Sequence, residues 1–191
     1  TPVLHTRWQV DALIAAGLPR RQSVYLKLNT GMNRLGFNAD EFPVALDSLA
    51  AADCLEAVSL MTHFADADEP RGIASQLEVF RAMTGNRRLP ASLANSAAIL
   101  RFPEAHADWV RPGIMLYGSS PFPGMRSAQE LDLQPVMTLE SELIAVRELA
   151  AGDTVGYGSS FAADPRMRIG VVEGGCADRD PRRCITNKPV L

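Results

Sequence analysis

Lysine is scarce in this chain of 191 residues, in which Lys27 and Lys188 are the only two. Arginine carries nearly all of the positive charge, and the formal net charge is −3 with acidic and basic residues interspersed. A nucleic-acid-binding surface needs positive charge concentrated on one stretch or face, and no stretch of this sequence provides it. The scarcity and dispersal of basic residues therefore argue against nucleic acid as a partner.

Cysteine is also rare, and its spacing forms neither a disulfide framework nor a zinc site. The three cysteines are Cys54, Cys176 and Cys184, and no Cys-x-x-Cys pair occurs. We interpret Cys176 and Cys184 as unrelated thiols rather than a reactive pair, and we expect a reducing, cytoplasmic location.

Long hydrophobic runs are missing as well. No apolar run approaches the ~18 residues of a membrane span, so we expect no membrane association. The first residues, TPVLHTRWQV, contain neither a signal-peptide core nor an initiating methionine. We expect the chain to be a piece of a longer protein.

Short apolar runs alternate with amphipathic segments over the first two thirds of the chain. Apolar residues at i, i+3, i+4 and i+7 follow candidate helix caps at Thr6 and Asp40. Repeated strand–helix units predict a parallel sheet, either doubly wound or a (β/α)8 barrel. Only four or five units are present, so a complete barrel would need more chain on the N-terminal side. The predicted strands are residues 2–5, 24–29, 57–62 and 89–94, and the predicted helices follow Thr6, Asp40, Gly72 and Asn95.

The pattern changes near residue 120. Residues 119–135, SSPFPGMRSAQELDLQP, are rich in proline, glycine and polar residues and predict a helix-free linker. Beyond them, residues 136–149 alternate with period two, and the stretches TVGYGSSF and RIGVV predict further strands without helices between them. We therefore predict a partial barrel over residues 1–128 and the start of an all-β domain over residues 129–191.

Polar residues follow successive predicted strands at the point where each strand ends. These residues are Lys27 with Arg34, His63, Asn95 with Ser96, and Arg111. Chemistry in parallel α/β sheets gathers at the carboxyl ends of the strands. One such residue alone is more often structural, but four successive strand ends favour a functional site.

Several of these positions have competing interpretations. Ser96 precedes a short helix, where its hydroxyl could hold a phosphate or simply cap the helix. Gly113, in the Arg-Pro-Gly-Ile turn, would let backbone N–H groups approach a ligand closely. His63 lies near Asp66 and Asp68, but no second histidine supports a metal site, so we expect a solvated loop and no metal. Lys27 could be a Schiff-base nucleophile, a charge partner of Arg34 or a solvent-facing strand residue.

Six motifs, in order, resemble those of bacterial alanine racemases: YLKLNTGMNRLGF, MTHFADAD, LANSAAILRF, WVRPGIMLYG, MTLESELIAVREL and GDTVGYGSSF. The resemblance covers residues 1 to about 172. It implies a pyridoxal 5'-phosphate enzyme with a barrel and a β domain, acting on alanine as a homodimer. It also implies a role in peptidoglycan precursor synthesis or D-alanine catabolism.

The resemblance implies a role for each matching residue. Arg34 resembles the arginine near the cofactor's phenolic oxygen that receives the substrate carboxylate, and Lys27 a lysine that is carboxylated in many members and braces that arginine. His63 resembles the histidine between the pyridine-side arginine and the catalytic tyrosine. Arg111 resembles the arginine that faces the pyridine nitrogen. The cofactor phosphate would be held by Asn95, Ser96, Gly113 and Ile114.

The sequence departs from the family where the second catalytic base is expected. In place of Gly-Tyr-Ala-Asp-Gly it has Gly-Cys-Ala-Asp-Arg, with Cys176 at the tyrosine position and Arg179 at the second glycine. The family's anchoring lysine lies upstream of this chain, so Lys27 is not expected to be the anchor. We therefore expect an intact parent enzyme that racemises alanine and a fragment that does not.

Other functions remain as alternatives. The chain could be a non-catalytic pyridoxal-phosphate-binding barrel, although such proteins lack the β strands predicted after residue 130. It could also be a degraded, non-functional copy. A preference for serine over alanine would depend on pocket residues outside the chain.

Overall fold

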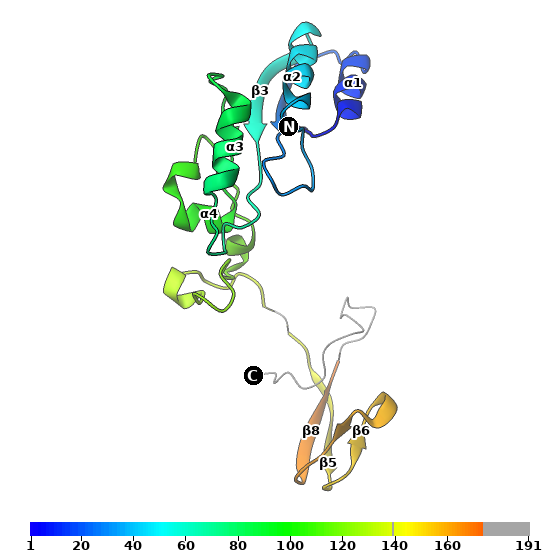
Figure 1. Ribbon diagram of the computed structural model, residues 1–191. Coiled ribbons are helices and arrows are strands. Elements are labelled where there is room, and N and C mark those ends of the chain that lie inside the picture. The colour runs from blue at the N-terminus through cyan, green and yellow to red at the C-terminus, as the bar shows by residue number, and fades with distance from the viewer. Residues whose placement is uncertain (139, 174–191) are drawn as a thin grey trace. The chain divides into compact units, whose positions relative to one another are not determined.

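A computed structural model describes residues 1–138 and 140–173 of the chain, which belong to two compact units, Thr1–Met137 and Thr138–Leu191 (Figure 1). Strands and helices alternate through the first unit, as predicted. Its elements are β1 (Val3–Leu4), α1 (Arg7–Ala15), β2 (Gln22–Lys27), α2 (Glu41–Ala51), β3 (Leu55–Met61), α3 (Ala74–Thr84), β4 (Ala91–Ser92) and α4 (Ser96–Arg101).

The four strands form one parallel sheet in the order β1-β2-β3-β4. Lys27 at the end of β2 is paired with Met61 at the end of β3, and Met61 with Ser92 at the end of β4. An isolated parallel bridge between Ser92 and Trp109 extends the sheet by one more position. This sequential parallel order, with a helix after each strand, is that of a partial α/β barrel.

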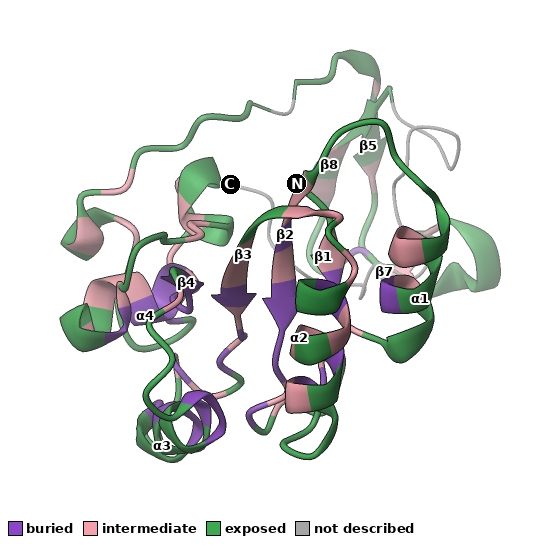
Figure 2. Cartoon of the chain, turned by 90° about the horizontal axis from the view of Figure 1, so that it is seen from above, coloured by how far each residue is buried: buried purple, intermediate pink, exposed green. Residues whose placement is uncertain are grey.

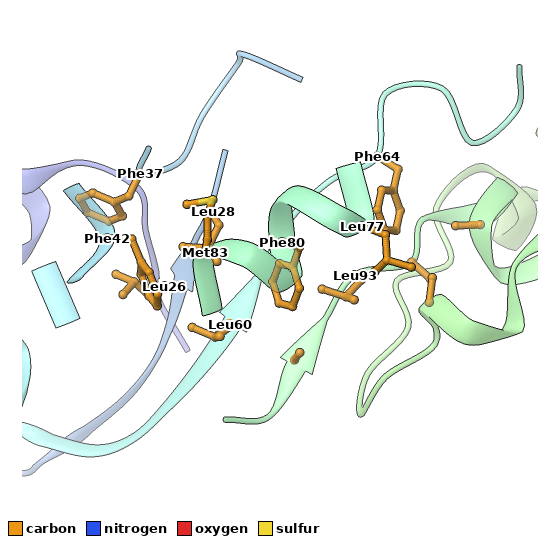
Figure 3. Packing of buried hydrophobic residues seen from close by; sticks show 14 of the residues in the cluster. Leu26, Leu28, Phe37, Phe42, Leu60, Phe64, Leu77, Phe80, Met83 and Leu93 are labelled. Atoms are coloured by element: carbon orange, nitrogen blue, oxygen red, sulfur yellow. The ribbon is translucent and has the colours of Figure 1, made fainter. Parts of the chain in front are cut away.

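The hydrophobic core lies between the sheet and its helices. Val24 and Leu26 of β2 are buried against the helices, whereas the intervening Tyr25 is only half-buried. Figure 2 shows the buried residues concentrated towards the ends of β2 and β3 and along one side of α3. Figure 3 shows side chains of all these elements meeting in one cluster. Burying a side chain such as Phe42, which is 0% exposed, stabilises the fold by about 2–3 kcal/mol.

Asp40 stands directly before α2, as predicted, but its side chain does not cap the helix. Asp40 already has helical backbone angles (φ −80°, ψ −32°), and its side chain makes no capping bond. The chain turns earlier, at Asn38, whose carbonyl accepts the N–H of Phe42 at 3.0 Å while the Glu41 carboxylate accepts the N–H of Asn38 at 2.8 Å. Thr6 does precede α1, but it too makes no side-chain cap bond.

The segment after the sheet contains short 3-10 turns rather than a plain linker. Ile114–Tyr117 forms one such turn before the predicted linker, and Gln129–Leu131 forms another within residues 119–135, which were predicted to be free of helix. Phe122 from the same segment is buried, with the guanidinium groups of Arg101 and Arg126 each 6.0 Å from its ring centroid. Phe122, together with the partly buried Leu131, therefore packs against the core of the first unit.

The second unit is an antiparallel β structure in the part that is described. β5 (Leu143–Leu149) pairs with β8 (Met167–Val172), and β6 (Thr154–Val155) pairs with β7 (Phe161–Ala162). The predicted period-two strand over residues 136–149 is seen as strand only from Leu143 onward. Across both described ranges, no helix is long and apolar enough to cross a membrane.

Candidate active site

The parallel strands bring the predicted polar residues to one edge of the sheet. Lys27 ends β2, His63 follows β3, Ser96 begins the helix after β4, and Arg111 follows the Trp109 bridge. Parallel strands in register end at the same edge, so these side chains lie along one edge of the sheet. We call this edge, with Lys27, His63, Ser96 and Arg111, the rim.

Arg34 lies on a loop that closes back onto the end of β2. The N–H of Phe37 donates to the Lys27 carbonyl at 2.8 Å, and the N–H of Asn29 donates to the Phe37 carbonyl at 2.9 Å. The Asn29 side-chain oxygen accepts the N–H groups of Gly31 at 3.2 Å and Asn33 at 3.0 Å. This closed loop presents Arg34 beside Lys27 in a small hollow that both residues line.

Arg111 is held by three acceptors from two neighbouring strand ends. Its guanidinium donates to the Ser92 hydroxyl at 2.6 Å, the Thr62 carbonyl at 2.6 Å and the Leu93 carbonyl at 3.3 Å. The Ser92 hydroxyl in turn donates to the Trp109 carbonyl at 3.0 Å. Because each acceptor lies on a different residue, the plane of the guanidinium is fixed against the rim.

The rim concentrates positive charge. Lys27, Arg34 and His63 line the same hollow, and among the described residues no carboxylate lines it. Burial, followed by the charges of Arg34 and Arg111, lowers the pKa of the Lys27 amine. Burial, followed by the charges of Arg111, Lys27 and Arg34, lowers the pKa of His63 to about 4. Burial also lowers the pKa of Arg111. The arrangement suits an anionic ligand and keeps His63 neutral near pH 7.

The low pKa of His63 predicts a stability that falls with acid. The imidazole has a pKa of 6.5 in the unfolded chain and about 4 in the folded one, so only the unfolded chain gains a proton as the pH drops. Stability present above pH 6.5 should be lost progressively down to pH 4, by about 1–2 kcal/mol because solvent screens the half-buried ring. Urea unfolding of the wild type and of His63→Gln between pH 7 and 5 checks this. The free energy of unfolding should fall more steeply with decreasing pH for the wild type than for His63→Gln. Equal pH dependence for the two proteins would contradict the prediction.

Ser96 and the Arg-Pro-Gly-Ile turn meet at the same rim. The helix cap of α4 is Asn95, whose side-chain oxygen accepts the N–H of Ala98 at 3.1 Å, so Ser96 is not the cap. The Ser96 hydroxyl instead accepts the N–H of Gly113 at 2.8 Å. Gly113 and Ile114 are exposed, which leaves their backbone open to a ligand.

Three buried polar residues of the site escaped the sequence analysis. Thr30 and Thr62 place their hydroxyls 2.7 Å apart, and Ser92 holds Arg111. Thr62 directly precedes His63, and Ser92 lies within the predicted strand at residues 89–94, so their positions offered a signal. Their partners lie at least 17 residues away in sequence, and no local pattern reveals such pairs.

The other predicted residues either lie away from the rim or fall outside the residues that the structure describes. Cys176 and Arg179 lie outside the described residues. Asp66 forms an ion pair with Arg71 at 3.6 Å. Within the described ranges, His, Cys, Asp and Glu side chains form no group of three that could hold a metal ion.

Comparison with known proteins gives matches along nearly the whole chain. The family model "Alanine racemase, N-terminal domain" matches residues 1–121, and "Alanine racemase, C-terminal domain" matches residues 136–191. The alanine racemase of Nitrosospira multiformis is 54% identical over 192 residues, which cover 99% of this chain and 54% of that protein. That of a Polaromonas species is 52% identical over 192 residues, covering 99% of this chain and 53% of that protein.

Solved structures agree with the sequence matches. The biosynthetic alanine racemase from Pseudomonas aeruginosa matches with a TM-score of 0.86 and 44% identity, covering 94% of this chain and 51% of that one. The alanine racemase from D-cycloserine-producing Streptomyces lavendulae matches with a TM-score of 0.82 and 33% identity, covering 94% of this chain and 50% of that one. The chain spans about half the length of the relatives it matches.

Proposed function

This chain belongs to the alanine racemase family, and from that premise we propose that its parent protein interconverts L- and D-alanine with pyridoxal 5'-phosphate. The observation that carries the proposal is the rim itself. It combines the guanidinium groups of Arg34 and Arg111, the Lys27 amine with its lowered pKa, a neutral His63, and a hydroxyl–amide cradle at Ser96 and Gly113.

The cradle fits a phosphate group. A Cβ added to Gly113 would lie 3.7 Å from the Ser96 hydroxyl oxygen, so an alanine methyl would occupy the space that a ligand oxygen needs. The Ile114 N–H and the Ser96 hydroxyl can donate to phosphate oxygens, and the Gly113 N–H, which donates to the Ser96 oxygen at 2.8 Å, holds that hydroxyl in place. Asn95 holds this segment by capping α4 and donating to the Phe64 carbonyl at 3.1 Å.

Each remaining rim residue has a role that its chemistry supports. Pyridoxal phosphate, when bound, supplies the electron sink that acidifies the Cα–H of an amino acid. We assign Arg111 to the pyridine nitrogen because a guanidinium can only donate a hydrogen bond and keeps its proton. We assign Arg34 to the substrate carboxylate and Lys27, carboxylated on its amine, to bracing Arg34. His63 stays neutral beside Arg111 and can relay a proton.

The second base and the partner subunit complete the proposal. Racemisation needs proton transfer on both faces of Cα. By motif, Cys176 stands where the family has the catalytic tyrosine, contributed across a homodimer, and a thiol is a shorter base than a phenol. We therefore propose that the 191 residues alone do not racemise alanine. The cysteine spacing supports a reducing, cytoplasmic location.

One alternative now has less support. A non-catalytic pyridoxal-phosphate-binding barrel would lack a β domain, whereas residues 136–191 match the C-terminal domain of the racemases. A degraded copy is the remaining rival, and an activity measurement separates it from a racemase.

The decisive experiment joins this chain to all the parts of the Nitrosospira multiformis racemase that it does not cover, on both its N-terminal and C-terminal sides. D-alanine formation from L-alanine is then measured for the chain, the hybrid, and the hybrid with Cys176→Tyr and Arg179→Gly. We expect no activity from the chain, whose only lysines are Lys27 and Lys188, and a rate at least about 100-fold higher for the repaired hybrid than for the unrepaired one.

A further Ser96→Ala change in the repaired hybrid serves as the control. It should raise the cofactor concentration required for half-maximal activity and leave much of the rate at saturating cofactor. A repaired hybrid that is inactive at every cofactor concentration would overturn the proposed function and favour the degraded copy. D-alanine made by the 191 residues alone would overturn the proposed inactivity of the fragment.

A further inference from the structure

Gln76 is a buried polar residue on the apolar face of α3. Its side chain is 5% exposed, and it shares that face with Ile73, Leu77 and Phe80. A buried amide is costly unless all of its hydrogen-bonding capacity is used. The contacts of Gln76 therefore show what this residue holds in place.

The Gln76 amide uses every one of its polar atoms on the two loops that carry the rim residues. Its Oε1 accepts the N–H of Ala65 at 2.7 Å. Its Nε2 donates to the His63 carbonyl at 3.3 Å and to the Thr30 hydroxyl at 3.3 Å. A Cβ on Gly31 would lie 3.5 Å from Gln76 Cγ, so the Gln76 side chain also lies close against the turn at Gly31.

The bonded groups lead directly to the charged residues of the rim. Ala65 and His63 belong to the segment after β3, and Thr30 and Gly31 begin the loop that carries Arg34. The Thr30 hydroxyl contacts the Thr62 hydroxyl at 2.7 Å, and the Thr62 carbonyl accepts from Arg111 at 2.6 Å.

We propose that Gln76 is a positioning residue that sets where His63 and the Thr30–Gly31 turn stand relative to each other. The side chain reaches from a helix outside the sheet into the gap between two loops and fixes both with one rigid amide plane. His63 and Arg34 thereby stay in the same hollow. The consequence for catalysis rests on the proposed function, whereas the positioning itself does not.

The positioning has a spectroscopic consequence that a merely structural glutamine would lack. His63 is surrounded by the charges of Lys27, Arg34 and Arg111 and is partly withdrawn from water. If its backbone anchor is removed, the imidazole moves towards solvent and away from those charges. Its pKa should then rise from its low folded value.

The test compares variants of the 191-residue chain by NMR without cofactor. Gln76→Met keeps the side-chain length and removes all three bonds. We expect the His63 pKa to rise by about one unit or more towards its ordinary value. We also expect exchange of the Ala65 amide hydrogen to quicken about 10-fold or more.

Two further variants keep the result interpretable. Thr84→Val removes a buried hydroxyl that donates to the Phe80 carbonyl at 2.9 Å on the same helix, so it should lower stability and leave the His63 pKa unchanged. Gln76→Glu keeps the acceptor for Ala65 and removes both donated bonds. It should shift the Thr30 and Gly31 amide signals while Ala65 stays protected, and it decides the matter if Gln76→Met does not fold.

The inference is overturned if Gln76→Met folds with the His63 pKa and the Ala65 exchange rate of the wild type. It is also overturned if Thr84→Val moves the His63 pKa as far as Gln76→Met does, or if Gln76→Glu leaves the Thr30 and Gly31 signals in place. All readings are made without cofactor or substrate. An inactive repaired hybrid would therefore refute the proposed function and leave the positioning role standing.

Discussion

Replacing Gly36 with alanine is expected to destabilise the first unit by about 3 kcal/mol or more. Gly36 has a φ of +125°, a conformation that side chains rarely adopt, and an added Cβ would lie 2.6 Å from the Asn29 nitrogen and 2.7 Å from the Leu28 carbonyl carbon. Both atoms are backbone of the strand end, so no rotamer change relieves the clash. The loop must pull away from β2, and the Phe37 bonds to Lys27 and Asn29 are lost with it.

Urea unfolding of the first unit measures this effect, and Gly85→Ala provides a matched control. Gly85 also has a positive φ, of +55°, but an added Cβ there meets nothing within 4 Å. At its backbone angles (φ +55°, ψ −130°) the control should cost only the backbone strain, about 1–3 kcal/mol, and less than Gly36→Ala. If both variants lost the same stability, the close approach of Gly36 to the backbone of Leu28 and Asn29 would not be required for closing the Arg34 loop.

Arg111→Met is expected to lower stability by about 2–3 kcal/mol and to raise the pKa of His63. Three donated hydrogen bonds disappear, and the carbonyls of Thr62 and Leu93 lose their charged donor. After burial, the Arg111 charge is the largest cause of the low His63 pKa, so a neutral side chain lets the imidazole hold its proton more tightly.

NMR titration of His63 and urea unfolding, both on the 191-residue chain, check the two halves of this prediction. Arg81→Met removes an exposed arginine of α3 and should change neither quantity by a measurable amount. Arg111→Lys keeps the positive charge and cannot reach three acceptors at once, so it should lose stability while keeping most of the His63 shift. A His63 pKa unaffected by Arg111→Met would show that the two side chains do not interact.

The sequence predicted the elements of the first unit because their pattern is local. The spacing of Val10, Leu13 and Ile14 identified the face of α1, and the apolar runs identified β2 and β3, with ends differing by about two residues. The rim followed from these elements, since the ends of parallel strands must meet. Its roles came from the family resemblance and remain proposals.

Features that depend on neighbours in space could not be predicted in this way. Asp40 has a good capping side chain, but the Asn38 carbonyl and Glu41 carboxylate complete the turn before it. Gln76 interrupts an apolar stripe, which marks it as unusual, yet its partner Thr30 lies 46 residues earlier. The predicted strand at 136–149 is seen as strand only from Leu143, where antiparallel pairing with β8 begins.

The hydrogen bonds that link Gln76, Thr30, Thr62 and the Leu28 carbonyl form one row, and the direction of each bond in it is determined. Gln76 Oε1 must face the Ala65 N–H, which turns its amino group to Thr30 and makes the Thr30 oxygen an acceptor. The Thr62 hydroxyl points at the Leu28 carbonyl, 3.1 Å away, so Thr30 must give its own hydrogen to Thr62. The row therefore has a single polarity, from the amide to the carbonyl, and aligned dipoles of this kind strengthen one another. Turning the Thr62 hydroxyl towards Thr30 would remove its hydrogen bond to the Leu28 carbonyl.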